Sequence, residues 1–161
     1  MKKKEYMTKI HKIIELGAWI CWMLSLVIAI YGTCTLPNTI ATHFTIYGEA
    51  DGYGSPGALL ILPIIMFFCL GICSLVIHLV KPEYWNIPFQ VKEKNKVSVY
   101  KNMLLIVVLL ELEIAIFTLY SEIKSYQQSG KGMLGAVGIF MIFLAVTIVS
   151  LCIKAYKQNQ K

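Results

Sequence analysis

Three ionisable side chains lie within residues 36–55, LPNTIATHFTIYGEADGYGS, a stretch that contains no lysine. They are His43, Glu49 and Asp51. An imidazole and carboxylates can form an ion pair or hold a metal ion, but this spacing matches no zinc or calcium pattern closely, so we assign no metal. A chain reversal at Gly48 is sterically easy. We therefore expect His43 and Asp51 to meet, either as a structural clasp or as part of a ligand site.

Turn-forming residues punctuate the same stretch, so we expect a structured loop rather than a flexible spacer. Pro37 closes the preceding apolar run, and Gly48 allows a turn. The rings of Phe44, Tyr47 and Tyr53 are expected to pack on the membrane interface or on helix ends. The candidate residues that bind a ligand or structure the loop are Pro37, His43, Phe44, Gly48, Glu49 and Asp51.

A second pair of ionisable residues, Glu111 and Glu113, lies in the apolar segment LLIVVLLELEIAIF. An ionised glutamate at the centre of a span costs about 3 kcal/mol, and a strongly apolar residue contributes at most about 0.6 kcal/mol in return. This segment should therefore insert with help from other helices or with neutral carboxyl groups.

The two glutamates point about 200° apart on a helix, so they cannot share one groove. The face of Glu111 carries Leu104, Val108, Ala115, Thr118 and Glu122. We expect this face, rather than that of Glu113, to line the bundle interior. Glu111 is a candidate proton or cation site. The alternative is a buried acid that is hydrogen-bonded to a hydroxyl, phenol or indole of another helix.

Five further residues receive plain structural roles. Glu15 and His78 fall near the ends of apolar runs, where an ionisable side chain costs little. Gly132, Gly135 and Gly138 recur every three residues and are expected to mark a close helix contact.

Four apolar runs are each long enough to span a bilayer as a helix, which takes about 20 residues. They cover residues 14–34, 57–80, 102–120 and 133–153. With 57% hydrophobic and only 15% charged residues, the chain has the composition of a membrane protein rather than of a soluble domain. We expect an all-α bundle of four transmembrane helices that forms a single membrane domain over residues 1–161, without a cofactor.

Lysine placement predicts the orientation of these spans, because cytoplasmic loops carry the excess of positive charge. Five lysines precede the first span, none lies in the loop 35–56, five lie in the loop 81–101, two separate the last two spans, and three follow the fourth. Both termini and the loop 81–101 are therefore expected in the cytoplasm, and the loop 35–56 outside. The net charge of +6 follows from the same rule and from anionic lipid, so no nucleic-acid partner is expected.

The stretch LPNTIATHFTIYGEADGYGS resembles the signature loop of a bacterial membrane family that carries the domain of unknown function DUF1648 and includes SdpI-type immunity proteins. The family pattern is approximately L-P-x-x-I-P-x-H-F-x-x-x-G-x-x-D-G-x-x-S-K. Ala41 replaces the usual proline, and Pro56 replaces the usual lysine, which removes a charge partner of Asp51. The later segment NIPFQVKEKNKVSVY is also similar, so the likeness is expected to cover roughly residues 14–120.

The resemblance implies a non-enzymatic protein of the bacterial cytoplasmic membrane. It would give immunity to, or sense, an extracellular antimicrobial peptide or envelope ligand through residues 36–55. One alternative is a small transporter or transporter accessory subunit that uses Glu111. Another is an intramembrane enzyme built on His43 and Asp51, although no serine, cysteine or metal-ligand motif supports catalysis. The expected partners are the lipid bilayer, the extracellular ligand and a membrane partner protein.

Overall fold

The computed structural model describes residues 6–161 and contains four long helices and one small sheet. Lys2, Lys3 and Lys4, which contribute to the predicted orientation, lie outside the described residues. The long helices are α1 (Lys9–Thr35), α2 (Ile61–Leu79), α3 (Lys96–Tyr126) and α4 (Met133–Gln160). The strands are β1 (Ile40–Phe44) and β2 (Ala50–Gly54), and the short 3-10 helices are η2 (Pro56–Leu60), η3 (Pro82–Tyr84) and η4 (Glu93–Asn95).

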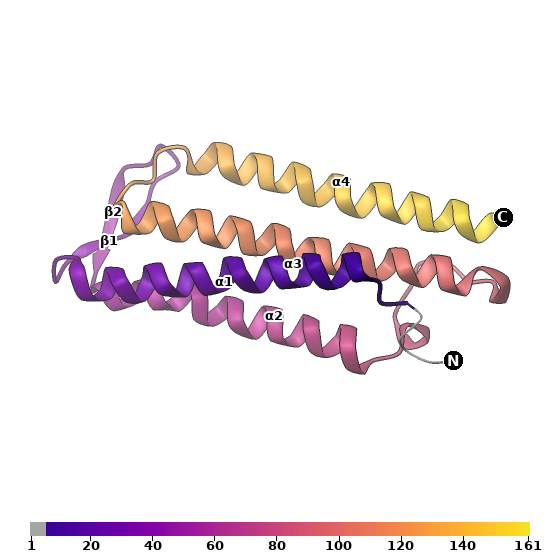
Figure 1. Cartoon of the computed structure of the whole chain (residues 1–161). Helices are drawn as coiled ribbons and strands as arrows, with labels where there is room; N and C mark the ends of the chain where they lie inside the picture. The colour runs from indigo at the N-terminus through magenta and orange to yellow at the C-terminus, as the bar shows by residue number, and fades with distance from the viewer. Residues whose placement is uncertain (1–5) are drawn as a thin grey trace.

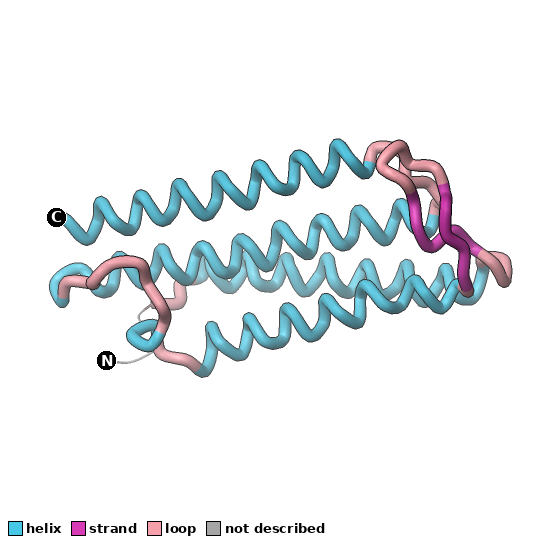
Figure 2. The backbone as a smooth tube through the Cα atoms, turned by 180° about the vertical axis from the view of Figure 1, so that it is seen from behind, coloured by secondary structure: helices cyan, strands magenta, loops and turns pink. Residues whose placement is uncertain are grey.

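The four helices lie side by side and alternate in direction along the chain (Figure 1). The strands β1 and β2 lie at one end of the bundle, beside the connection between α3 and α4 (Figure 2). We call this the hairpin end. The beginning of α1 and the end of α4 lie at the opposite end, together with the connection between α2 and α3, and we call this the terminal end.

All four helices are long and apolar enough to cross a membrane, which confirms the prediction of four such helices and indicates a multi-pass membrane protein. α1, α3 and α4 extend beyond the predicted spans by several residues, whereas α2 lies within the predicted range 57–80, because the first residues of this range belong to the 3-10 helix η2. For example, α1 begins at Lys9 rather than at residue 14, because Thr8 and His11 form a capping box that satisfies free amide groups of the first turn. Apolar runs predict the membrane core of a helix and miss its polar end turns.

α3 is the central helix and packs against α1, α2 and α4. Its contact with α1 is the most extensive, and the buried face of α1 carries the small residues Ala18, Ser25, Ala29 and Gly32, which allow close approach. α4 packs on α3, where the rings of Phe117 and Phe140 stack with centroids 4.5 Å apart. Most large apolar side chains of α4 are exposed, as expected of a helix that faces lipid.

The predicted close helix contact at the glycines of α4 is wrong for two of the three. A Cβ atom at Gly135 or Gly138 would meet nothing within 4 Å, so no helix approaches these residues in the described part of the chain. Gly132 has a different role, because it precedes α4 with a φ of +84°, a conformation that favours glycine. The α3–α4 contact uses aromatic side chains instead.

The loop between α1 and α2 is structured, as predicted, but it contains two strands that the all-α prediction does not include. β1 and β2 are antiparallel, with Ile40 opposite Gly54 and Phe44 opposite Ala50. Ile40 is buried beside Leu59 and Ala29, so the base of the hairpin packs on the helix ends. We call residues 40–54 the hairpin.

Candidate functional site

The hairpin brings His43 and Asp51 together. Nδ1 of His43 lies 2.5 Å from Oδ1 of Asp51, and the side chains are 72% and 44% exposed. His43 pairs with Gly52, where a Cβ atom would lie only 2.9 Å from the Cβ of His43. Glycine at position 52 therefore leaves room for His43. The pair lies on the hairpin surface, where it can be reached from solvent.

A tight reversal joins the two strands, as the sequence predicts for Gly48. The amide of Gly48 donates to the carbonyl of Thr45 at 2.9 Å, and the amide of Thr45 donates to the carbonyl of Glu49 at 2.8 Å. The φ of Gly48 is +84°, where a side chain would be strained. This reversal places Asp51 back beside His43.

The connection between α3 and α4 supports the hairpin from behind. The amide of Ala41 donates to Oε1 of Gln128 at 2.6 Å. Gly130 packs on Gly48 and on Phe44, since a Cβ atom at position 130 would lie 2.8 Å from the Cα of Gly48 and from the Cβ of Phe44. Phe44 is thus a docking residue of the hairpin, and the hairpin is held at two points.

The other predicted loop residues do not join the His43–Asp51 pair. Glu49 is exposed, and its side chain has no hydrogen bond or ion pair within residues 6–161. Pro37 is exposed directly after α1 ends. Of the two expected packing sites, the helix ends are not used by Tyr47 and Tyr53, because both rings are exposed, Tyr47 by 82%. Packing on the membrane interface stays a prediction. The hairpin therefore presents an aromatic surface with two acidic side chains.

The structure places Glu111 in the bundle interior, on the face that the helical period predicts. It is only 3% exposed, and Leu104, Val108, Ala115, Thr118 and Glu122 are buried with it. Neither carboxyl oxygen of Glu111 has a hydrogen-bond partner within the described chain. The hydrogen bond to a hydroxyl, phenol or indole of another helix, which the sequence leaves open for Glu111, is not formed within the described chain.

Glu113 faces α4 instead and has the hydroxyl partner that Glu111 lacks. The Oγ1 of Thr147 donates to Oε1 of Glu113. Beside this bond, a groove of about 470 Å³ runs between α3 and α4 and is lined mostly by apolar side chains, including Phe117, Phe140 and Phe143. The two neighbouring glutamates thus occupy different environments, one in the α1–α2–α3 interior and one against α4.

A hydrogen-bonded cluster of Glu15, Trp19, Ser74 and His78 joins α1 to α2. Nε2 of His78 lies 2.9 and 3.0 Å from the two carboxyl oxygens of Glu15. Ser74 donates its hydroxyl to Glu15 at 3.0 Å, and the indole of Trp19 donates to Ser74 at 3.3 Å. From the sequence, Glu15 and His78 are expected to lie separately near helix ends, where an ionisable side chain costs little free energy. In the structure Glu15 is buried and bonded to His78. The burial of Glu15 could have been predicted from its four-residue spacing from His11, which places both residues on the buried face of α1.

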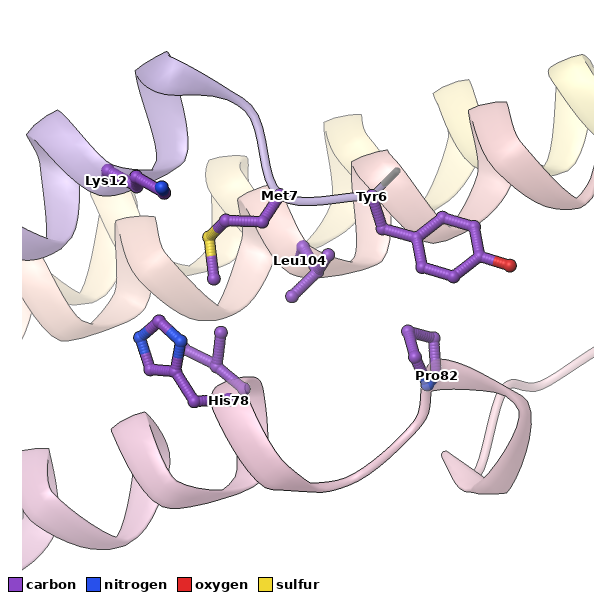
Figure 3. Close-up of a pocket in the computed structure, with 7 residues that line it drawn as sticks. Tyr6, Met7, Lys12, His78, Pro82 and Leu104 are labelled. Atoms are coloured by element: carbon purple, nitrogen blue, oxygen red, sulfur yellow. The ribbon is translucent and has the colours of Figure 1, made fainter. Parts of the chain in front are cut away.

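His78 also lines a cavity of about 440 Å³ at the terminal end. In Figure 3, Lys12 of α1 and His78 of α2 lie at one side of this cavity, and Tyr6 and Pro82 lie at the other. The Tyr6 hydroxyl donates to Glu83 at 3.2 Å, which links the chain before α1 to η3. His78 is half exposed, so the cavity gives access to the cluster from the terminal end.

A second polar cavity, of about 300 Å³, lies beneath the hairpin. It is lined by side chains of β1, η2, α2 and α3, among them Thr42, Glu122 and Ser125. Glu122 is almost fully buried, and its Oε1 has no partner within residues 6–161. The described chain contains no group of three or more histidine, cysteine, aspartate or glutamate residues that is placed to hold a metal ion.

A family model described as a domain of unknown function (DUF1648) matches residues 19–67. The match covers most of α1, the hairpin, η2 and the first turns of α2. It therefore includes His43 and Asp51 and excludes α3 and α4, and the predicted likeness up to residue 120 stays a prediction. No curated protein and no solved structure matches the chain.

Proposed function

We propose that this chain is a non-enzymatic protein of the bacterial cytoplasmic membrane that recognises an extracellular peptide through its hairpin, in the manner of an SdpI-type immunity or sensing protein. The hairpin would face outside and both termini the cytoplasm. The lysine distribution supports this orientation, because only Lys124 and Lys131 of the twelve lysines within residues 6–161 lie near the hairpin end.

The observation that carries the proposal is the exposed, well-supported surface of the hairpin. Tyr47, Tyr53 and Ile46 expose large apolar areas at or near the turn. Glu49 and Asp51 add negative charge, and residues 36–55 contain no lysine. Exposed aromatic side chains on a rigid element are typical anchors of protein interfaces.

The chemistry of this surface suits a cationic, amphipathic peptide. The aromatic rings offer contact to apolar side chains and to cations, and the carboxylates attract lysine or arginine side chains. Because Gln128 and Gly130 hold the hairpin in place, little conformational entropy is lost when a ligand binds. His43 in turn fixes the carboxylate of Asp51 at the centre of this surface.

The test combines a phenotype with direct binding. Cells that lack the gene would be challenged with a panel of membrane-active cationic peptides, and the most effective peptide would be labelled and titrated onto the purified full chain in nanodiscs. Tyr47→Ala and Asp51→Asn should weaken binding by about tenfold each, since they remove an exposed anchor and a charge. Tyr84→Ala is the matched control, because Tyr84 is 77% exposed at the terminal end.

Membrane abundance separates a working site from a structural clasp. His43→Ala and Asp51→Asn should lose protection at normal abundance. Unchanged resistance across the panel in the deletion strain, or equal binding by wild type and the Tyr47→Ala variant, would contradict the proposal. A loss of abundance in both variants would assign His43 and Asp51 to the stability of the hairpin instead.

A further inference from the structure

Of the seven buried polar side chains of α1 and α3, five follow the interior faces of these helices along the bundle. The other two, His11 and Asn102, are bonded to Lys101 and to Gln158 near the terminal end. Both helices run from the terminal end to the hairpin end (Figure 1). We call these side chains the polar seam; they are Glu15 and Ser25 of α1, and Glu111, Thr118 and Glu122 of α3. Each is more than nine-tenths buried. Polar side chains are costly inside a membrane, so five of them on two neighbouring helices need a physical explanation.

Three members of the polar seam carry oxygens without a hydrogen-bond partner within residues 6–161. They are both carboxyl oxygens of Glu111, the hydroxyl of Ser25 and Oε1 of Glu122. An unpaired polar group in hydrocarbon costs several kcal/mol, and buried polar groups of native proteins are bonded to protein or to ordered water. Each of these oxygens therefore calls for a proton or a water molecule as its partner.

The terminal end of the polar seam opens through His78. Its Nε2 is bonded to both carboxyl oxygens of Glu15, while its Nδ1 has no hydrogen bond within the described chain. An imidazole can accept a proton at one nitrogen and donate the proton of the other. The half-exposed ring of His78 can thus pass a proton from the cavity of Figure 3 to the buried carboxylate of Glu15.

Glu111 stands at the midpoint of α3, fifteen residues from Lys96 and fifteen from Tyr126. Glu15 of α1 lies at a similar level along the bundle, because a Cβ atom on Gly17 would lie 3.3 Å from Cδ1 of Leu112. α4 contacts the opposite face of α3, where Thr147 is bonded to Glu113. The titratable groups that face Glu111 therefore come from α1 and α2, and Glu15 is the acid through which it connects to the terminal end.

The hairpin end of the polar seam opens through Glu122. Glu111 and Glu122 are separated by about 16 Å along the helix axis, from the rise per residue. Gly17 lies beside Leu112 and Gly32 beside Tyr126, so the hydroxyls of Ser25 and Thr118 lie at levels between Glu111 and Glu122. A hydroxyl can donate and accept at the same time. Glu122 then reaches the cavity under the hairpin, where Thr42 and Ser125 add further hydroxyls.

We propose that the polar seam conducts protons between the cavity at His78 and the cavity at Glu122, with Glu111 as the obligatory carboxyl group at the centre. Each proton that His78 takes up moves to Glu15, through water to Glu111, and along the hydroxyls to Glu122, from which one proton leaves. No bond other than O–H and N–H bonds is made or broken, and no electron is transferred. The activity is separate from recognition by the hairpin.

The test is proton flux into vesicles that contain the full chain. The protein would be reconstituted with a trapped pH-sensitive dye, and valinomycin with an outward potassium gradient would supply the driving force and balance the charge. Wild type should acidify the lumen faster than empty vesicles. Glu111→Gln and Glu122→Gln should each reduce the flux by about tenfold, because the amide cannot take up and release the proton.

Glu113→Gln is the matched control. It makes the same chemical change two residues from Glu111, but on the face that contacts α4, so the flux should stay within about twofold of wild type. A wild-type flux equal to that of empty vesicles would overturn the proposal, and so would an equal loss in the Glu113→Gln and Glu111→Gln variants. If Glu111→Gln does not yield a monodisperse protein, the flux of the Glu122→Gln variant is compared with that of the Glu113→Gln variant instead. An equal loss of flux in these two variants would likewise overturn the proposal.

Discussion

The backbones of Gly48 and Gly130 lie against each other where the hairpin meets the connection between α3 and α4. A Cβ atom on Gly48 would lie 2.7 Å from the carbonyl carbon of Gly130 and 2.8 Å from the amide nitrogen of Lys131. Gly48 also has a φ of +84°. The position of the exposed His43–Asp51 pair therefore depends on a contact with the second half of the chain.

Gly48→Ala should release the hairpin from this support. The added methyl group would clash with backbone atoms and strain the left-handed conformation, at a combined cost of about 2–4 kcal/mol. Limited proteolysis of the protein in detergent should show faster cleavage between residues 40 and 54. Gly135→Ala is the control, because its Cβ atom would meet nothing within 4 Å. Equal cleavage of both variants would show that the glycine contact does not hold the hairpin.

Gln128→Ala tests the second point of support. Its side chain accepts from the amide of Ala41 at 2.6 Å and donates to the carbonyl of Ser125 at 2.6 Å. Ala41 is buried, so loss of the acceptor leaves a buried amide unpaired, which costs about 1–3 kcal/mol. The thermal unfolding midpoint in detergent should fall, and Gln127→Ala at the exposed neighbouring position should leave it unchanged. The reverse order of effects would contradict the assigned hydrogen bond.

The helices could be predicted from the sequence because each buries a long apolar run in the membrane. The 200° separation of Glu111 and Glu113 follows from the helical period, and the structure has the two residues on different faces. Their partners could not be predicted in the same way. Thr147 meets Glu113 only because of the rotation of α4 against α3, and no local pattern in the sequence sets that rotation.

The cluster around Glu15 shows the same limit. His78 lies 63 residues away in the chain, and the pair forms because α1 and α2 lie side by side and antiparallel. For the hairpin, Gly48 predicted the reversal and hence the approach of His43 to Asp51. The strands themselves were missed, since Ile40–Phe44 and Ala50–Gly54 are too short to show a clear alternation.

Asn159→Ala should loosen the terminal end of the bundle. Asn159 is buried near the end of α4, accepts from the amide of Lys92 at 2.9 Å and donates to the carbonyl of Gln90 at 2.9 Å. Its side chain thereby fastens the connection between α2 and α3 to α4. The loss of two hydrogen bonds to backbone groups should cost about 2–4 kcal/mol.

Hydrogen exchange measured by mass spectrometry should locate the effect of Asn159→Ala. Faster exchange is expected in peptides that cover residues 85–95, with no change in the hairpin. Gln160→Ala is the control, because Gln160 is exposed and accepts only from the Lys92 side chain at 3.4 Å. Faster exchange in the hairpin instead would contradict the assignment of Asn159 to the terminal end.

The orientation of the chain is tested by cysteine labelling in intact cells. The structure selects the labelling sites: Tyr47 is exposed at the hairpin end, and Glu93 is exposed at the terminal end, whereas Gln128 and Asn159 are unsuitable because their side chains hold the hairpin and the α2–α3 connection. In a chain without its native cysteines, a membrane-impermeant maleimide should label Tyr47→Cys and not Glu93→Cys.

After the cells are permeabilised, both variants should react, which controls for the accessibility of Glu93→Cys. The expected asymmetry follows from the two lysines near the hairpin end against ten elsewhere in the described residues. Labelling of Glu93→Cys but not of Tyr47→Cys in intact cells would invert the orientation. The hairpin would then face the cytoplasm, and recognition of an extracellular peptide by His43, Asp51 and the exposed tyrosines would be ruled out, while proton conduction along the polar seam would be unaffected.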